Sequence, residues 1–273
     1  ADIDVYDIEI DSADPQAIID TISNIAPTFG GINLEDIKAP ECFIIEKALQ
    51  KKLDIPVFHD DQHGTAIVLA AGLLNAMEIQ QKKPENAKIV CIGCGAAGLA
   101  SMELLTHFGI PKENITCVDS KGPLHLQRQD LSVYKSVWQN ATAAETLEGA
   151  LENADILIGL SGPNIVSEAH VRLMADKPII FALSNPDPEI HPDIVKNCSP
   201  NALMATGRSD FPNQINNVLC FPYIFRGALD AQAKHISLAM KLAAVEAIRN
   251  ISKDSHIPDS LRKKYPHQNW NFG

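Results

Sequence analysis

The chain has 273 residues, a hydrophobic content of 45% and a formal net charge of −11 at pH 7. This length allows one large domain, or one domain and part of another, and the apolar content argues against a disordered chain. The negative charge disfavours nucleic acid and anionic membrane surfaces as partners. It does not exclude an anionic substrate, because local donors and a bound cation decide how such a substrate is held.

The cysteines and the chain ends give further bounds. Six cysteines are too few for a disulfide scaffold, and the C-x-x-C pattern at Cys91–Cys94 overlaps a strand end and a glycine-rich turn. We therefore interpret the cysteines as small buried residues of a cytoplasmic protein. The sequence shows no signal peptide and no apolar run long enough to span a membrane. It begins without Met and ends without a capped helix, so we expect both ends to continue in a longer polypeptide.

The N-terminal residues are predicted to form a strand and then a helix. Ile3–Ile10 alternates apolar and acidic residues, which is typical of a half-buried strand. Ser12 or Asp14 can cap a helix that runs to Ile25, because Pro15 fits the first helical turn and apolar residues follow at helical spacing.

Two acidic pairs flank the next predicted helix and strand. Glu35-Asp36 precedes a helix at Glu41–Leu53, whereas Asp60-Asp61 follows a buried strand at Ile55–Phe58. This arrangement could bring Glu35, Asp36 and Asp61 together, and carboxylate oxygens suit Mg²⁺ or Mn²⁺. Alternatively, each pair only caps the helix that follows it. The helix is expected to present one apolar face, formed by Phe43, Ile44, Ala48 and Leu49.

Two histidines flank the second acidic pair. His59 and His63 could act in proton transfer or metal binding. Hard cations prefer oxygen ligands, however, and His63 could simply cap a helix. That helix, predicted at Thr65–Gln80, is apolar nearly all round and should be buried between layers. Local composition favours a domain junction at the polar stretch Lys82–Asn86.

A glycine-rich turn follows the next predicted strand. Lys88–Ile92 is a short apolar strand, Gly93-Cys94-Gly95-Ala96-Ala97-Gly98 comes directly after it, and Leu99–Phe108 is predicted to be a helix. The next strand, Ile115–Val118, ends at Asp119. This is the setting of a dinucleotide-binding G-x-G-x-x-G motif. Gly93 would allow the tight turn, Gly95 the approach of a pyrophosphate, and Gly98 the close packing of helix on strand.

More strands alternate with helices downstream, which predicts a doubly wound parallel sheet of Rossmann type. Strands at Ala154–Leu160, Pro178–Leu183 and Asn201–Thr206 lead into turns that contain Ser161, Asn185 and Gly207. Ligands of such sheets lie beyond the carboxyl ends of the strands, which favours a functional role for these turns. Ser-Gly-Pro and Ser-Asn-Pro also form ordinary turns.

The remaining residues are predicted to form a loop and one long helix. Phe211–Val218 is rich in amides, and Asn216 and Asn217 could donate to carboxylate or carbonyl oxygens. An Asn-Asn pair alone is more typical of a simple turn. Gly227–Ile251 is predicted to be a single amphipathic helix that covers a sheet face or a subunit interface.

These motifs together resemble those of the malic enzymes, which oxidatively decarboxylate malate. The resemblance extends over about residues 1–251, and the sequence is most similar to malic enzymes of the bacterial type. It implies that residues 1–63 are the C-terminal part of a smaller α/β substrate and metal domain. Residues 64–273 would then be an NAD(P)-binding Rossmann domain with C-terminal helices. The segments that carry the resemblance are Phe29–Asp36, Val57–Thr65, Gly93–Gly98, Leu183–Pro186 and Ala205–Asn217.

The resemblance also implies residue roles. Glu35, Asp36 and Asp61 would bind Mg²⁺ or Mn²⁺, and Asp60 would orient a catalytic lysine. Asn185 and Asn217 would hold the substrate. In this family the general-base lysine and the general-acid tyrosine lie upstream of the point where this chain begins, so we expect the isolated chain to be incomplete for catalysis. NAD or NADP would contact Gly93, Gly95, Ala96, Ala97, Gly98, Asp119, Ser120, Lys121, Ser161 and Asn185.

The implied reaction moves a hydride from malate C2 to the nicotinamide, loses CO₂ with help from the metal, and protonates the enol to pyruvate. Malate and pyruvate would be the ligands, and a homodimer or higher homo-oligomer the assembly. Two alternatives stay open. One is a different NAD(P)-dependent dehydrogenase, such as an amino-acid dehydrogenase, which needs no metal. The other is a non-catalytic nucleotide-binding fragment.

Cofactor choice is predicted to depend on the residues after the second strand of the nucleotide-binding unit. Asp119 can accept a hydrogen bond from the ribose 2′-OH, which favours NAD. Ser120 and Lys121 could instead contact the 2′-phosphate of NADP. Because these effects oppose each other, we expect both cofactors to be tolerated.

Overall fold

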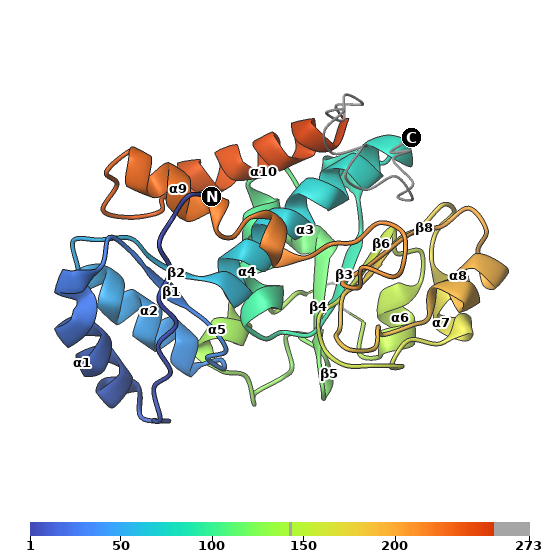
Figure 1. The fold of residues 1–273 in the computed structure, drawn as a ribbon. Helices are drawn as coiled ribbons and strands as arrows, with labels where there is room; N and C mark the ends of the chain where they lie inside the picture. The colour runs from blue at the N-terminus through green and yellow to red at the C-terminus, as the bar shows by residue number, and fades with distance from the viewer. Residues whose placement is uncertain (142–143, 254–273) are drawn as a thin grey trace.

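A six-stranded sheet lies at the centre of the larger part of the molecule (Figure 1). The computed structural model describes residues 1–141 and 144–253. The strand order is β5-β4-β3-β6-β7-β8, and all neighbouring pairs are parallel except β4 with β5. This order, with its switch point between β3 and β6, confirms the predicted Rossmann-type sheet. The strands are β3 (Ile89–Ile92), β4 (Ile115–Asp119), β5 (Gly122–Pro123), β6 (Ile156–Gly159), β7 (Ile179–Ala182) and β8 (Leu203–Thr206).

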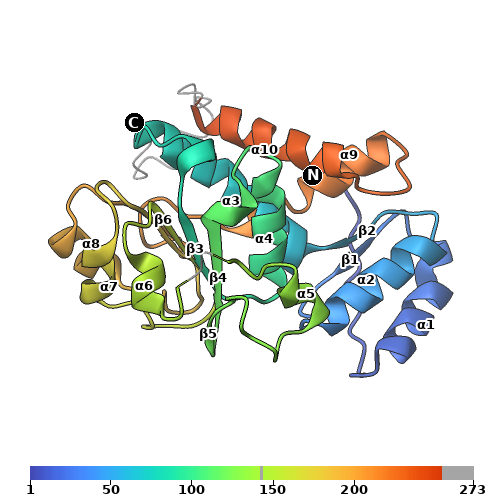
Figure 2. The same ribbon diagram turned by 180° about the vertical axis from the view of Figure 1, so that it is seen from behind.

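Each strand contributes side chains to both faces of the sheet, because successive residues of a strand point in opposite directions. In β3, Ile89 and Cys91 join one apolar core, whereas Val90 and Ile92 join another. The first core includes α3 (Asp60–Ile79), α4 (Ala96–Thr106), α9 (Tyr223–Asp230) and α10 (Leu238–Lys253). The second includes α6 (Leu147–Leu151), α7 (Glu168–Leu173) and α8 (Pro192–Cys198). Figures 1 and 2 show these two groups of helices on opposite sides of the sheet.

The N-terminal residues form a smaller unit beside this sheet (Figure 2). Its two short strands, β1 (Ile32–Leu34) and β2 (Val57–His59), pair in parallel, with α2 (Glu41–Lys52) as their connection. Helix α1 (Pro15–Ile25) packs with α2 over a separate core, and Asp14 caps α1 as predicted. The proposed boundary between residues 63 and 64 falls within the first turn of the continuous helix α3.

Several shorter elements lie between these helices and strands. Helix α5 (Val133–Ser136) lies beside the carboxyl end of the sheet. Within the described ranges, the 3₁₀ turns are η1 (Ala26–Thr28), η2 (Pro84–Asn86), η3 (Lys112–Asn114) and η4 (Asn217–Leu219). No helix within residues 1–141 and 144–253 is both long enough and apolar enough to cross a membrane.

The structure corrects two predictions at the ends of the described chain. Residues 3–10 do not form a strand, and Val5 and Tyr6 are exposed. Alternation of side chains is therefore insufficient where no neighbouring strand offers an edge. The single helix predicted at Gly227–Ile251 is divided into α9 and α10. The division follows from Gln232, whose φ of 49° lies in the left-handed region that ends helices.

The predicted apolar face of α2 is also partly wrong. The residues that α2 buries in the small core are Ile45 and Leu49, with Cys42 buried beside them, whereas Ile44 is 47% exposed. By contrast, α3 is buried along most of its length, as its uniformly apolar sequence predicts. It begins at Asp60, so both carboxylates of the second acidic pair lie in its first turn.

Candidate active site

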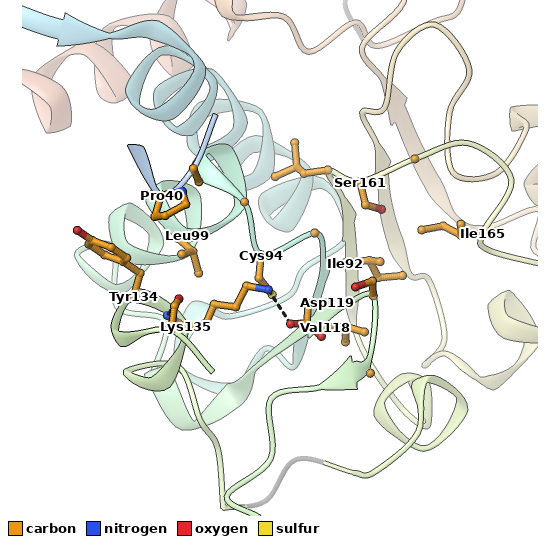
Figure 3. Close-up of a pocket in the computed structure, with 18 of the residues that line it drawn as sticks. Pro40, Ile92, Cys94, Leu99, Val118, Asp119, Tyr134, Lys135, Ser161 and Ile165 are labelled. Carbon is orange, nitrogen blue, oxygen red and sulfur yellow. Dashed lines mark hydrogen bonds and ion pairs between the residues drawn. The ribbon is translucent and has the colours of Figure 1, made fainter. Parts of the chain in front are cut away.

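A cavity of about 850 Å³ opens at the carboxyl ends of β3, β4 and β6 (Figure 3). Its walls include the glycine-rich turn, the end of β4 and the turn after β6, as predicted for a dinucleotide site. Pro40 and Phe43 of the smaller unit and Tyr134 of α5 complete it. The sequence motifs gave no indication of these three residues, because they come from segments remote from the glycine motif.

The three motif glycines have three different steric environments. Gly93 has a φ of +113°, and a Cβ at this position would lie 2.3 Å from the carbonyl oxygen of Leu160. A Cβ at Gly98 would lie 1.9 Å from the carbonyl oxygen of Gly93. At Gly95, however, a Cβ would meet nothing within 4 Å. Side chains are therefore excluded at Gly93, in the tight turn, and at Gly98, where α4 packs against that turn. Gly95 instead faces open space of the kind that a pyrophosphate needs.

The N-terminus of α4 adds backbone donors at the same place. Ala96 and Ala97 form its first turn, and Gly95, as the N-cap residue, offers no side-chain cap. The first N–H groups of a helix have no intrahelical partners, and the helix dipole favours an anion there. This arrangement suits a phosphate group.

The carboxylate of Asp119 lies in a network of cations. It accepts hydrogen bonds from Arg128 Nη1 at 2.7 Å and from Lys135 Nζ at 2.6 Å, the second of which Figure 3 shows. Burial acts to raise the pKa of Asp119, but these hydrogen bonds outweigh it and lower the pKa to about 2. Asp119 is therefore ionised, and much of its capacity to accept further hydrogen bonds is already used.

The predicted cofactor residue Lys121 has a different partner. Its Nζ lies 2.7 Å from Asp130 Oδ2, and its side chain is 68% exposed. It does not line the cavity, whereas Lys135, Ser120 and Ser161 do. Lys135 was missed in the sequence because it lies 16 residues after Asp119, in the short helix α5, which the sequence patterns did not predict.

The second acidic pair begins with a buried carboxylate. Asp60 is 3% exposed, and its Oδ2 accepts a hydrogen bond from Asn217 Nδ2 at 2.7 Å. Burial, reinforced by the charges of Glu35 and Asp61, raises the pKa of Asp60 to about 7. A Cβ at Gly64 would lie 1.7 Å from Asp60 Oδ1, so the glycine one turn later gives this carboxylate its place. Oδ1 has no hydrogen-bond partner among the described residues.

The three predicted metal ligands are neighbours. The backbone N–H of Asp36 donates to Asp61 Oδ2 at 2.9 Å, and Asn33 donates to Glu35 Oε2 at 2.8 Å. Burial, together with the charges of Asp61 and Asp36, raises the pKa of Glu35. Oxygen donors crowded in this way have the chemistry that a hard cation prefers. Nevertheless, within residues 1–141 and 144–253 no group of three His, Cys, Asp or Glu side chains is arranged to hold a metal ion.

A buried hydrogen-bonded chain supports the turn that carries these acids. Glu46 of α2 accepts from the backbone N–H of His59 at 3.2 Å and from His63 Nε2 at 2.9 Å. Lys241 Nζ of α10 lies 2.9 Å from His63 Nδ1. Burial lowers the pKa of His63, so this histidine is neutral and its Nε2 carries the proton. His63 thus forms a structural link between helices α2, α3 and α10.

Asn185 does not line the dinucleotide cavity. It lies in a separate, open hollow of about 760 Å³ at the ends of β7 and β8, together with Gly207, Arg208 and Gln214. A Cβ at Gly207 would lie 2.9 Å from Asn185 Nδ2, which means that the glycine admits the amide side chain. The two predicted substrate residues are therefore held by different elements. Asn185 follows β7, whereas Asn217 lies in η4 and contacts Asp60.

The strand order, the glycine turn and a helix terminus suited to an anion define a Rossmann-type dinucleotide-binding protein. A model of the family "malic enzyme, NAD binding domain" matches residues 62–267. Over its whole length the chain is 53% identical to an NADP-dependent malic enzyme of Halomonas elongata. Over 255 residues, 93% of the chain, it is 49% identical to an NAD-dependent malic enzyme of Rhizobium meliloti. The chain belongs to the malic enzyme family.

A solved structure agrees with this assignment. The NAD-dependent malic enzyme from Thermotoga maritima matches 90% of the chain with a TM-score of 0.85 and 42% identity. These relatives are longer than the chain, which spans 64% of the Halomonas protein, 33% of the Rhizobium protein and 66% of the Thermotoga chain. NAD-dependent and NADP-dependent relatives are similarly close, so membership of the family does not select the cofactor.

Proposed function

We propose that this chain is part of an enzyme that catalyses the oxidative decarboxylation of malate to pyruvate and CO₂ with reduction of NAD or NADP, and that the general-base lysine and the general-acid tyrosine come from outside the chain. The observation that carries the proposal is the steric pattern of the glycine turn in a chain of this family. Two glycines exclude any side chain, and the third leaves the space open beside a helix N-terminus. The dinucleotide's pyrophosphate would lie over Gly95, with its adenosine ribose toward Asp119.

The substrate would lie between the dinucleotide and the acidic turn. Asn217 would orient malate from a position fixed by its hydrogen bond to Asp60, and Asn185 would approach from the end of β7. Asp60 would hold the positive charge of a catalytic lysine, because a buried carboxylate with a free oxygen attracts such a partner. A divalent cation near Glu35, Asp36 and Asp61 would stabilise negative charge on the C2 oxygen when bound.

Calorimetry can test the substrate. Malate is titrated into the chain saturated with NADPH and Mn²⁺, and glutamate is titrated in parallel as the substrate of an amino-acid dehydrogenase. We expect saturable heat with malate but not with glutamate. In Asn217→Ala the malate affinity should be about tenfold weaker, because a hydrogen bond to a charged group is lost. Saturable heat with glutamate but not malate would favour the amino-acid dehydrogenase. Dinucleotide binding without either response would favour a nucleotide-binding fragment.

We also propose that both cofactors bind, and that Lys135 supports NADP more than Lys121 does. Lys135 lines the cavity, whereas Lys121 is paired outward with Asp130. A charge-assisted contact to a 2′-phosphate contributes about 1.5 kcal/mol or more, so Lys135→Ala should weaken NADPH about tenfold and NADH little. Lys121→Ala is the matched control. Selective loss of NADPH binding in Lys121→Ala, with none in Lys135→Ala, would reverse the assignment.

A further inference from the structure

A buried carboxylate joins two turns at the edge of the sheet where the ligands are expected. Glu189 is 1% exposed, and its Oε1 accepts a hydrogen bond from the backbone N–H of Ser161 at 2.9 Å. Its Oε2 accepts from the backbone N–H of Ser184 at 3.1 Å. Ser161 follows β6 and Ser184 follows β7, which are neighbouring parallel strands. One side chain thus connects the exits of two adjacent strands.

The end of β6 is shaped to admit this carboxylate. A Cβ at Gly159 would lie 2.4 Å from Glu189 Cδ and 2.7 Å from its Oε2. Only glycine leaves room there. The position of the Glu189 side chain thus depends on the space at Gly159 of β6 as well as on its two hydrogen bonds.

The backbone around Glu189 holds the turn after β6 as well. The N–H of Val166 donates to the carbonyl oxygen of Glu189 at 3.0 Å, and the N–H of Asn164 donates to that of Pro188 at 3.1 Å. With the bond to Ser161, three hydrogen bonds fix the segment 161–166 against the residues that follow β7. The position of the turn after β6 is therefore fixed by the segment that follows β7.

This turn is also a wall of the dinucleotide cavity. Ser161 lines the cavity, as Figure 3 shows, and the glycine turn packs closely on the peptide between Leu160 and Ser161 at Gly93. On the other side, Ser184 immediately precedes Asn185, the predicted substrate residue. A displacement of the Glu189 side chain would therefore shift both the turn after β6 and the turn after β7.

Charge considerations distinguish this carboxylate from ordinary packing. Among the described residues no ion pair involves Glu189, and burial raises its pKa. A buried acid without a cation costs stability, and an apolar side chain would fill the space at lower cost. A carboxylate, however, can accept from two converging N–H groups at once, whereas an amide offers one acceptor and one donor.

We propose that Glu189 is a positioning residue that holds the turns after β6 and β7, so that Ser161 in the cavity and Asn185 in the hollow beyond β7 and β8 both meet the nicotinamide half of the dinucleotide, which would extend from the cavity toward that hollow. This inference rests on the proposed dinucleotide binding. In a sheet of this order the adenosine half lies on the side of β3 and β4, and the nicotinamide half lies on the side of β6 to β8. Loss of Glu189 should therefore affect the two halves of the cofactor unequally.

The test compares NADH with ADP, which contains only the adenosine half. In Glu189→Gln, one buried N–H loses its acceptor, so we expect NADH to bind about tenfold more weakly while ADP binding changes by less than about twofold. Glu189→Asp, which is too short to reach both turns, should give the same selectivity. Asp155→Asn is the matched control. Asp155 also accepts a hydrogen bond from a backbone N–H, that of Lys88 at 3.0 Å, but it lies at the amino ends of the strands, away from the expected ligands. It should leave both affinities unchanged.

The outcomes separate two failures. If wild-type protein binds NADH and both Glu189 variants bind it equally well, or lose NADH and ADP in parallel, Glu189 is not a positioning residue for the nicotinamide half. If the folded wild-type protein binds neither NADH nor NADPH, the proposed function itself fails. Thermal unfolding of each variant identifies any that do not fold, and Glu189→Asp then decides if Glu189→Gln is among them.

Discussion

The glycine turn after β3 and the acidic turn after β2 both follow a buried strand and both open a helix, but they are held in different ways. The glycine turn is determined by backbone contacts, since Gly93 and Gly98 exclude a Cβ because of nearby carbonyl groups. The acidic turn depends on side chains from distant segments, such as Glu46 of α2, Asn217 of η4 and Lys241 of α10. A short local motif can therefore specify the first turn, whereas the second requires the assembled fold.

The largest effect is expected where a side chain would meet backbone. Gly98→Ala places a Cβ 1.9 Å from the carbonyl oxygen of Gly93, which cannot move without distorting the turn. We expect a loss of about 3 kcal/mol in the free energy of unfolding, measured by urea denaturation, because overpacking of this kind costs that much. Stability equal to wild type would show that the glycine turn is more adaptable than its contacts indicate.

The ion network at the end of β4 should give a smaller, pH-dependent effect. The folded-state pKa of Asp119 is about 2, below the ordinary value, so its ionisation stabilises the folded protein. This contribution is complete above about pH 4 and is lost as the pH falls through about 2. Asp119→Asn should lower the free energy of unfolding by about 1 to 2 kcal/mol at pH 7. The difference from wild type should be the same at pH 5 and smaller at pH 3; a difference that grows on acidification would contradict the assignment.

A small effect on stability is expected in the acidic turn. Gly64→Ala would bring a Cβ within 1.7 Å of Asp60 Oδ1, but that atom belongs to a side chain that can rotate away. Alanine is favoured over glycine in a helix by about 1 kcal/mol, so stability should change little. The hydrogen bond between Asp60 and Asn217 should be lost, which a shift of the Asn217 side-chain amide resonance in NMR would report. An unchanged resonance would show that Asp60 has not moved.

The same contrast explains how far the sequence alone can be interpreted. The G-x-G-x-x-G turn, the parallel strands and Asp119 follow from short patterns with local physical causes. Lys135, Arg128 and Glu189 could not be recognised, because their partners are brought near by tertiary structure. The strand predicted at Ile3–Ile10 failed because alternation says nothing about a partner strand. The division of the last helix depends on one left-handed residue, Gln232, which no helix-breaking residue type marks.

The most direct test of the central claim is Gly95→Val. A Cβ at Gly95 meets nothing within 4 Å, and its φ of −88° is open to any residue, so the free protein should fold with unchanged stability. The same side chain would occupy the space assigned to the pyrophosphate. Gly227→Ala in α9, where a Cβ also meets nothing within 4 Å, is the control. In a fluorescence titration with NADH, we expect Gly95→Val to bind at least about a hundredfold more weakly than wild type, since the loss of several charge-assisted hydrogen bonds is involved. Gly227→Ala should match wild type. Equal NADH affinity in folded Gly95→Val and wild type would contradict the account of this turn as the pyrophosphate site.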